Sequence, residues 1–509
     1  MQEASSRLGG TRCARHWTLD GLAVHRNSQF DGRAAGDCWL AAVASEYPPA
    51  PMLPPSRQSR AHVTWISSDR AIPSRFVRPV LRFTRVESSG GIVLLLAAAA
   101  ALVWANAPFG ETYERFWNTH VAFSVGGFHL DESIRLVVND ALMVIFFFVV
   151  GLEIKRELVS GELRDPRAAA LPAIAALGGM IFPALIYVAF TIQGGEGVHG
   201  WGIPMATDIA FAVGVVALLG NRVPVGGKLF LLALAIADDI GAITVIAIFY
   251  TDKLALGYLG AALVGLALMY LARRVRVRSL AFYVPLGVIV WFMLFESGVH
   301  ATLAGVAIAL ITPATAMYPD REFHDRATRI LGRYDFDAKR PDAVERIDFD
   351  ALEVSAVAKE SVAPLDRIEN ALHPWSSFVI VPIFALANAG VRFTGVDFIA
   401  TATHPIALGV GLGLIAGKTI GITLFTWLAV RLGVGVLPRH TSWRHIVGLA
   451  AVAGIGFTVS LFVTGLAFDT IEFADRAKTG IFIGSAVAGI VGFVALRVMK
   501  PLPRDEGDA

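Results

Sequence analysis

Charged residues and cysteines are both scarce in this sequence. Only 17% of the 509 residues are charged, whereas a soluble protein has about 25%, and 55% are hydrophobic. The two cysteines, Cys13 and Cys38, lie in a polar N-terminal region, so the sequence indicates neither a disulfide framework nor a metal–thiolate site. The formal net charge is +2, and the basic residues lie in connections rather than on one face, which gives no indication of a nucleic-acid partner.

Residues 1–77 also lack an apolar segment long enough for the core of a signal peptide. They are rich in Arg, Ser, Gly and Pro. We expect a disordered cytoplasmic extension, or a start codon assigned upstream of the true one; a folded regulatory module is the alternative. Residues 501–509 are expected to form a short C-terminal tail.

Long apolar segments dominate the rest of the chain. From Ile92 almost to the C-terminus they recur at lengths of about 20 residues, and each could cross a hydrocarbon core about 30 Å thick. We therefore predict an all-α polytopic membrane protein, whose transmembrane domain covers residues 78–500 and contains about twelve helices. The expected spans are 91–107, 136–158, 168–192, 202–219, 228–250, 255–272, 280–295, 298–314, 374–390, 405–431, 445–467 and 478–498.

The distribution of Lys and Arg predicts the orientation of this domain. Basic residues gather before the first span and after the second, fourth, sixth, tenth and twelfth, and such connections are typically cytoplasmic. Examples are Arg78, Arg82, Lys155, Arg156, Arg273, Arg274, Arg497 and Lys500. The opposite connections contain few basic residues, except the last, with Arg476 and Lys478. Both termini are therefore expected in the cytoplasm.

Two connections are longer than the others. Between the first two spans, residues 113–130 form two short alternating segments around Gly126-Gly127, which predict a small β-hairpin on the outer surface. Between the eighth and ninth spans, residues 315–367 are strongly charged. They predict a solvated cytoplasmic loop that has room for a helix and carries no catalytic signature.

Four charged residues lie at membrane depth in the expected spans, namely Asp208, Asp238, Asp239 and Lys418. A charged side chain at the centre of a spanning helix costs about 2.5–3.5 kcal/mol, so each marks a candidate functional site. Asp140 lies closer to a helix end, where water can reach it. For any one of these residues, the alternative is a structural ion pair or a helix cap.

The adjacent pair Asp238-Asp239 fits that alternative less well. Neighbouring residues on a helix point about 100° apart, so the two carboxylates cannot share one partner. One can pair with Lys418 while the other faces an aqueous cavity. Two adjacent acids titrate as a coupled pair, and a dehydrated cation competes with protons for the same oxygen atoms. This arrangement is sufficient for exchange of protons against a cation.

The fourth and eleventh spans contain residues that interrupt helices. These residues are Gly202, Pro204, Thr207 and Asp208 in the fourth span, and Gly454, Gly456 and Thr458 in the eleventh. Two interrupted spans in corresponding places predict discontinuous helices that cross at the membrane midplane, with inverted repeats over spans 3–5 and 10–12. We expect Asp208 to offset the positive N-terminal helix ends at the crossing, and Lys418 the negative C-terminal ends. For the segment GIGFT (residues 454–458) taken alone, the alternative to a helix break is ordinary packing of small residues between helices.

Three other functions are less consistent with these residues. GLGLIAGKT is similar to a phosphate-binding loop, but Leu412 occupies the position of its first Gly, which argues against ATP-driven transport. An intramembrane aspartyl protease could pair Asp208 with Asp238 or Asp239, but would leave Lys418 without a role. A cation channel would use a ring of acids from several subunits.

At these residues the chain resembles the NhaA-type sodium/proton antiporter family. The resemblance covers about residues 86–498 in the family's order. It rests on SSGGIVLLLAAAAALVWAN, VNDALMVIFFFVVGLEIKREL, MATDIAFAVGVVALLGNRVP, LALAIADDIGAITVIAIFYT, ESGVHATLAGV, LHPWSSFVIVPIFALANAGV, AGKTIGITLF and GIGFTVSLF. The N-terminal extension and the 315–367 loop are not part of the common pattern.

The resemblance implies a role for each matching residue. Asp238 and Asp239 would bind Na⁺ or Li⁺ and carry protons, Lys418 would partner the first of them, and Thr207 and Asp208 would belong to the broken fourth span. Glu153, Arg156, Glu157 and Glu369 would form a pH-sensing cluster, and His300, a further pH-sensing candidate, would lie near the outer face. The resemblance also implies electrogenic exchange, a homodimer formed through the outer hairpin, the bacterial inner membrane as location, and no cofactor.

Overall fold

A computed structural model describes residues 89–499 apart from 126–127, 194, 252–253, 276, 278–279, 334–340 and 394–396. Every described residue belongs to one compact unit of the chain, which falls within Arg75–Ala509. The expected extension over residues 1–77, the tail over residues 501–509 and the Gly126-Gly127 turn lie outside the described residues.

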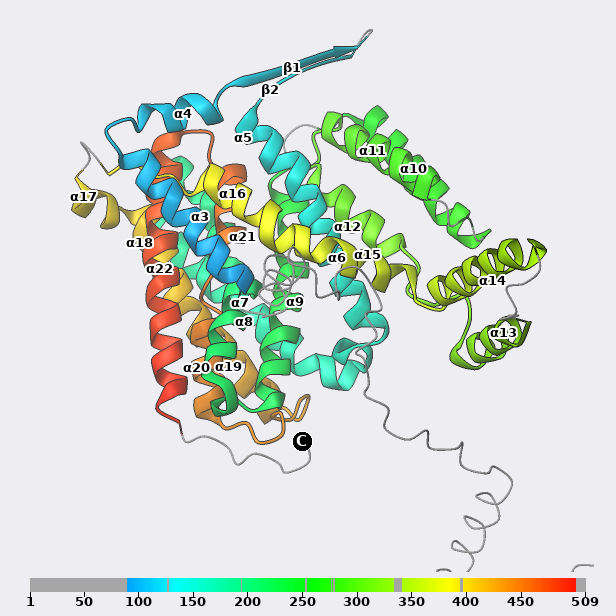
Figure 1. Cartoon of the computed structure of the whole chain (residues 1–509). Coiled ribbons are helices and arrows are strands. Elements are labelled where there is room, and N and C mark those ends of the chain that lie inside the picture. Colours follow the sequence, from blue (N-terminus) through cyan, green and yellow to red (C-terminus); the bar gives the residue numbers. More distant parts are fainter. Residues whose placement is uncertain are drawn as a thin grey trace, which may run out of the picture. The chain divides into compact units, whose positions relative to one another are not determined.

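Apolar helices make up most of the described chain (Figure 1). Nine of the described helices are long and apolar enough to cross a membrane, and a bent pair of helices makes up to ten. Two further apolar helices, α11 (Leu280–Glu296) and α12 (Thr302–Ile311), are shorter. The structure therefore confirms a polytopic membrane protein, and a helix occupies each segment in which a span was expected.

Several of these spans are built from more than one element. The continuous ones are α3 (Ser89–Asn106), α7 (Pro166–Thr191), α9 (Val225–Phe249), α10 (Leu256–Arg274) and α22 (Ile471–Arg497). Three further spans each contain a π-helical segment between two α-helices. In the first, η3 (Val138–Leu142) lies between α5 (Ile134–Val137) and α6 (Met143–Val159). In the other two, η7 (Ser376–Ile380) lies between α15 (Pro364–Trp375) and α16 (Val381–Asn388), and η8 (Gly413–Gly417) lies between α18 (Pro405–Leu412) and α19 (Lys418–Arg431). The remaining two are η5 (Gly195–Met205) with α8 (Ile209–Leu219), and α20 (Trp443–Val452) with α21 (Phe457–Ala467).

The predicted limits of three spans were wrong. The ninth span begins at Pro364 instead of residue 374, because an amphipathic first half carries its charged residues on one face. The twelfth begins at Ile471 instead of residue 478, so the basic residues assigned to an outer loop lie inside α22. There Lys478 Nζ lies 3.6 Å from Asp475 one turn earlier, which compensates its charge within the helix. The eighth span is shorter than expected, because α12 covers only Thr302–Ile311.

The expected hairpin is present, but it is shorter than residues 113–130. Strands β1 (His120–Val125) and β2 (Phe128–Ser133) pair antiparallel, and a helix, α4 (Glu111–Trp117), precedes them (Figure 1). The hydroxyl of Tyr113 in α4 is shared between the carbonyls of Leu386 and Ala387, at 2.9 and 2.8 Å. Burial raises the pKa of Tyr113 well above its ordinary value, so this hydroxyl remains a donor.

The charged loop expected over residues 315–367 forms two helices. They are α13 (Asp320–Arg333) and α14 (Pro341–Glu360), which lie side by side (Figure 1). The chain enters and leaves this helical pair at neighbouring points, because the N–H of Met317 donates to the carbonyl of Glu360 at 2.9 Å. The N–H of Leu365 likewise donates to the carbonyl of Pro313 at 3.1 Å. Short elements elsewhere are η4 (Glu162–Arg164), η6 (Gly220–Arg222) and α17 (Phe398–Ala402).

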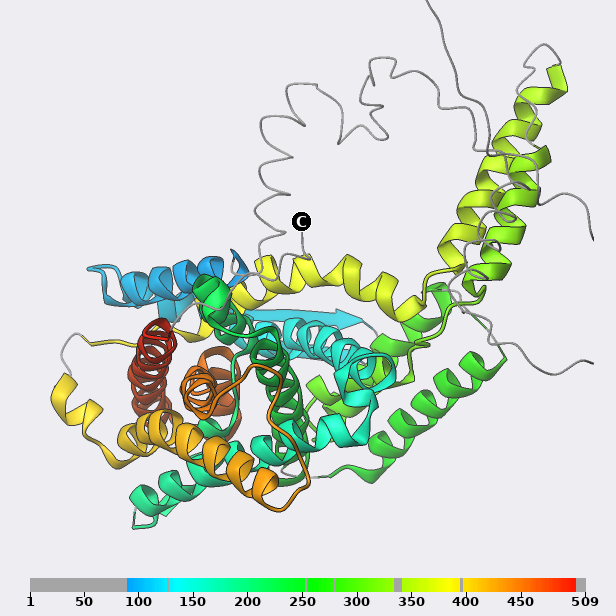
Figure 2. The ribbon, with the colours of Figure 1, turned by 90° about the horizontal axis from the view of Figure 1, so that it is seen from below.

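Close packing of α7 against α19 brings the middle of the chain to its C-terminal part (Figure 2). Glycines lie at the contact, where a methyl group added to Gly178 would lie 2.7 Å from Cβ of Phe425. Just before α19, a methyl group on Gly417 would lie 2.7 Å from Cα of Pro183 in α7. Because α7 and α19 pack this closely, Lys418, the first residue of α19, is buried in the interior.

Candidate ion-binding site

The two interrupted helices meet at their breaks. The N–H of Asp208, between η5 and α8, donates to the carbonyl of Ile455, between α20 and α21, at 2.6 Å. The hydroxyl of Thr207 donates to the carbonyl of Ala453 at 2.8 Å. No side chain fits at Gly456, because an added methyl group would lie 2.8 Å from the carbonyl oxygen of Ala206. The helix-breaking residues of the sequence therefore mark the place where the two chain segments cross, and α20 and α21 are bent by 49° there.

Asp208 binds the N-terminal ends of two helices at this crossing. Its carboxylate accepts the N–H of Phe211 in the first turn of α8 at 3.1 Å. It also accepts the N–H and the hydroxyl of Thr458 in the first turn of α21, at 3.0 and 2.5 Å. A carboxylate in this position stabilises the partial positive charge of both helix ends, as the sequence predicts.

Lys418 is fully buried and forms the cationic half of the site. Its Nζ donates to the carboxylate of Asp238, which is also fully buried, and to the hydroxyl of Thr207 at 2.9 Å. That Lys418 offsets C-terminal helix ends stays a prediction. The Thr207 hydroxyl, rather than the ammonium group, binds the carbonyl of Ala453, so Lys418 acts on that helix end through Thr207.

Asp239 has a different environment from that of its neighbour. It lines a cavity of about 800 Å³ whose wall also contains Asp208, Thr458 and Glu153, whereas Asp238 is not part of that wall. Within the described part of the chain, neither Oδ1 of Asp239 nor Oδ1 of Asp238 has a hydrogen-bond partner. The pair thus consists of one carboxylate held by a lysine and one that faces open space.

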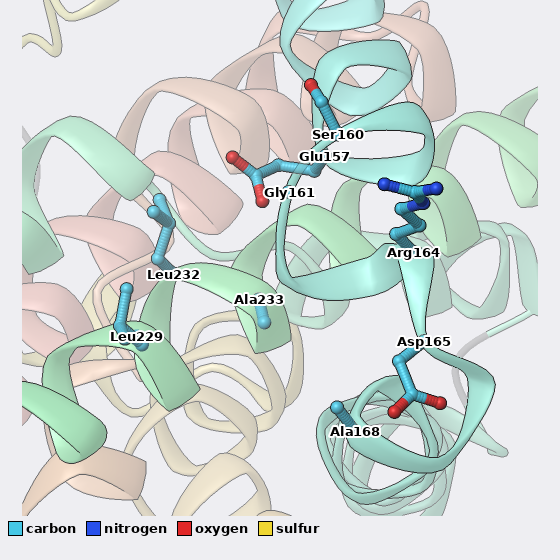
Figure 3. A pocket seen from close by; sticks show the side chains of 9 residues that line it. All are labelled: Glu157, Ser160, Gly161, Arg164, Asp165, Ala168, Leu229, Leu232 and Ala233. Carbon is cyan, nitrogen blue, oxygen red and sulfur yellow. The ribbon is translucent and has the colours of Figure 1, made fainter. Parts of the chain in front are cut away.

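A second cavity, of about 690 Å³, adjoins the first. The two share Leu229 and Leu232 of α9 in their walls. Figure 3 shows the carboxylate of Glu157 directed from the end of α6 toward these leucines, with Arg164 and Asp165 on the connection between α6 and α7. Carboxylates therefore line both spaces on either side of the two leucines.

The residues expected to sense pH form a cluster, with one exception. The Arg156 guanidinium pairs with the buried Glu369 and lies 3.9 Å from Glu157. Glu153, one turn before Glu157 on α6, lines the larger cavity. His300 lies in a different part of the structure, before α12, where its Nε2 is 2.6 Å from the carbonyl oxygen of Tyr250.

Two further expectations concern Asp140 and Gly454. Asp140 is half-buried in the π-helical segment η3, near the start of its span as predicted. Gly454 lies in the break before α21, where an added methyl group would lie 2.9 Å from Cβ of Ala488. In the described part of the chain, no group of three or more His, Cys, Asp or Glu side chains could hold a metal ion. The oxygen atoms at Asp239 fit a transiently bound hard cation better than a resident metal.

Several hydroxyl groups that support the crossing were missed by the sequence analysis. Tyr187, Tyr250 and Ser460 donate to backbone carbonyls of η5, and Ser485 accepts the N–H of Gly456 at 3.3 Å. The sequence offers little signal for them, because a tyrosine near the end of a span is ordinarily an interface anchor. Serines within spans are equally typical of helix packing.

Comparison with known proteins identifies the same group of transporters. Residues 81–496 match the family described as Na⁺/H⁺ antiporter 1. The chain is 45% identical over 434 residues to the Na(+)/H(+) antiporter NhaA of Rhodopirellula baltica, covering 84% of this chain and 96% of that protein. It is 44% identical over 439 residues to Na(+)/H(+) antiporter NhaA 2 of Sorangium cellulosum, covering 86% and 93% of the two chains.

These similarities extend over nearly the whole length of the relatives. The geometry of the site also argues for a transporter. The carboxylate of Asp208 accepts hydrogen bonds from the N-terminal ends of two helices, so it is not available as the second acid of an intramembrane protease. The chain therefore belongs to the Na⁺/H⁺ antiporter 1 family, as the resemblance predicted, and is a membrane transporter rather than an enzyme.

Proposed function

We propose that this protein exchanges cytoplasmic Na⁺ or Li⁺ for external protons. The observation that carries the proposal is the asymmetry of the aspartate pair, in which Lys418 holds Asp238 while Asp239 faces a cavity. The names of the relatives, all Na⁺/H⁺ antiporters, support the choice of substrates.

In this proposal, protons and Na⁺ compete for the carboxylate oxygens of the pair. A cation binds the deprotonated carboxylates, so its arrival releases protons and their return displaces it. Lys418 keeps Asp238 ionised in the empty site, and can release its own proton when Asp238 turns to the cation. Two protons moved for each Na⁺ or Li⁺ would make the exchange electrogenic.

We further propose the membrane arrangement that the sequence predicts. The domain over residues 78–500 would have twelve spans, with inverted repeats over spans 3–5 and 10–12 and the crossing at the midplane. Residues 1–77, 315–367 and 501–509 would lie in the cytoplasm of a bacterium, with the domain in its inner membrane. The contact between the breaks of two spans supports this arrangement. The β1–β2 hairpin would join two copies in a homodimer.

Regulation by pH is proposed for the cluster around Arg156. The ion pair between Arg156 and Glu369 joins α6 to α15. Glu153 of α6 lines the larger cavity beside α9, and Glu157 of α6 lines the smaller one. Protonation of these acids would weaken the link between the helices and change access to Asp239. His300 would act separately, through its contact with the end of α9.

Everted membrane vesicles test the exchange directly. With an acid interior and a pH-reporting dye, addition of Na⁺ or Li⁺ should release protons from wild-type vesicles, and K⁺ should have little effect. Asp239→Asn should abolish the response at every pH, whereas Asp397→Asn, at a helix cap outside the site, should leave it intact. A wild type without response despite correct insertion, or an active Asp239→Asn variant, would contradict the proposal.

A further inference from the structure

The hydroxyl of Tyr250 makes two hydrogen bonds to the backbone of η5. It accepts the N–H of Gly202 at 3.0 Å and donates to the carbonyl of His199 at 2.8 Å. Tyr250 is the residue directly after α9, so these bonds join the end of α9 to η5. The contact between the Tyr250 carbonyl and His300 fixes the backbone of the same residue independently of its side chain.

The helix η5 needs support from its neighbours. A 3-10 helix longer than about 3–4 residues is uncommon because its hydrogen bonds are poorly aligned, and η5 covers 11 residues. The hydroxyl of Tyr187 in α7 donates to the carbonyl of Gly197 at 2.6 Å, and that of Ser460 in α21 to the carbonyl of Ile203 at 2.8 Å. The helices α7 and α21 and the residue that follows α9 thus each contribute one hydroxyl group, and the last of these is that of Tyr250.

The contact leaves no space for a side chain at Gly202 of η5. A methyl group added at Gly202 would lie 2.7 Å from the Tyr250 hydroxyl and 3.1 Å from its ring carbon Cε2. The ring of Trp201 packs edge-on against Phe249 with 5.1 Å between ring centroids. The backbone of η5 is therefore held against the end of α9 by hydrogen bonds and by ring packing together.

This contact has a consequence for the ion site, because η5 ends two residues before Thr207. The Thr207 hydroxyl accepts a hydrogen bond from Lys418 Nζ at 2.9 Å, so a shift of η5 along α9 would move Thr207 away from Lys418. We propose that Tyr250 is a positioning residue, whose hydroxyl holds η5 against α9 so that Thr207 stays bonded to Lys418 while ions exchange at Asp239. Tyr250 does not line the cavity of Asp239, and the inference rests on the exchange proposed above.

Tyr250→Phe tests the role of the hydroxyl, with Tyr283→Phe as the matched control. Tyr283 donates to the carbonyl of Val277 at 2.9 Å and belongs to α11, away from the crossing. In everted vesicles Tyr250→Phe should raise the apparent KM for Na⁺ about three- to tenfold, the effect of losing one or two neutral hydrogen bonds. The maximal rate should stay within about twofold, since the ion ligands are intact, and Tyr283→Phe should match the wild type.

Gly202→Ala perturbs the same contact from the other side. Its methyl group displaces the hydroxyl, so the single variant should also raise the apparent KM. In the double variant with Tyr250→Phe the hydroxyl is already absent. The ring carbons Cε2 and Cζ, 3.1 and 3.2 Å from the added methyl group, remain in that variant. The KM of the double variant should therefore exceed that of Tyr250→Phe alone but stay below the product of the two separate effects.

The outcomes separate this inference from the proposed function. An active wild type whose KM is unchanged by Tyr250→Phe would overturn the positioning role and leave the exchange activity standing. Multiplicative effects of the two substitutions, or a lower maximal rate at unchanged KM, would overturn it as well. So would loss of inserted protein in Tyr250→Phe but not in Tyr283→Phe, because a positioning residue predicts folded protein with altered affinity. A wild type without Na⁺-dependent exchange would instead overturn the proposed function.

Discussion

Single residues decide which of two adjacent carboxylates is available to an ion. Asp238 and Lys418 are both 0% exposed and are paired, whereas Asp239 lines a cavity. A buried pair stabilises a fold only while it is complete, because removal of one partner leaves an uncompensated charge that the interior cannot solvate. The pair with Lys418 therefore fixes Asp238, and Asp239 is left as the carboxylate that would exchange its ligand in the proposed function.

Replacement of the lysine should expose this dependence. Lys418→Met should lower the free energy of unfolding by about 3–5 kcal/mol, since Asp238 would stay buried without a partner. The double variant Asp238→Asn with Lys418→Met removes both charges and should regain most of the loss. Thermal unfolding in detergent measures this coupling, with Lys359→Met on the exposed face of α14 as the control. An unfolding temperature of Lys418→Met equal to that of the wild type would show that the pair is not a structural unit.

The charge of Asp208 should matter more for ion affinity than for folding. Asp208→Asn removes the negative charge at two helix ends and keeps only one of the two oxygen acceptors, since Oδ1 accepts from Phe211 and Oδ2 from Thr458. The apparent KM for Na⁺ should rise about three- to tenfold, equivalent to roughly 0.7–1.4 kcal/mol. Asp397→Asn changes the same group at the cap of α17 and should have no effect on transport. Equal KM values for both variants would argue against a role of Asp208 in the site.

At the scale of elements, the sequence predicted those features that leave a local pattern. Helix breakers predicted the crossing, and charges at membrane depth predicted that one of the two aspartates pairs with Lys418. That this aspartate is Asp238 was implied by the family resemblance alone. The early starts of α15 and α22 were not predicted, because hydropathy ends a span at its first charged residues although Lys478 is compensated within its own helix. The bonds of Tyr250 to η5 leave no pattern at all, since they join a side chain to a backbone 48 residues away.

The crossing of α7 and α19 provides a test at this scale. Gly178→Ala inserts a methyl group against Phe425 and should cost about 1–3 kcal/mol, as overpacking does. Gly260→Ala places the same methyl group on α10 where nothing lies within 4 Å, so it should be neutral or slightly stabilising. Thermal unfolding of the two variants in detergent gives the comparison. Equal stability of Gly178→Ala and Gly260→Ala would contradict a close helix crossing.

The helices α13 and α14 should be separable from the transport unit. Their two ends meet at the bond between Met317 and Glu360, so a short Gly-Ser linker can replace residues 319–358 without moving Pro313 or Leu365. The shortened protein should insert and exchange Na⁺ at a rate within about twofold of the wild type. Arg367→Ala, which removes the 2.9 Å bond to the Lys359 carbonyl in the full chain, is the companion variant. Loss of insertion or of exchange in the shortened protein would mean that the helical pair is part of the transport unit.

At the scale of the whole molecule, the account depends on competition between protons and Na⁺ for one site. The crossing holds Asp208 and Thr207 in place, Lys418 holds Asp238, and the larger of the two cavities beside α9 reaches Asp239. In the proposed function, every part of this arrangement would serve a carboxylate whose ligand is a proton or a cation, never both. The pH dependence of Na⁺ affinity therefore tests the whole arrangement at once.

The most direct measurement is the apparent KM for Na⁺ at several pH values, determined with purified protein in liposomes, for the wild type and Asp239→Asn. Competition predicts that the KM falls with rising pH until the site is deprotonated, by about tenfold per pH unit for each proton that the cation displaces and so by up to about a hundredfold where it displaces two. Asp239→Asn should show no exchange at any of these pH values. A wild-type KM that does not change with pH, or full exchange by Asp239→Asn, would contradict the account.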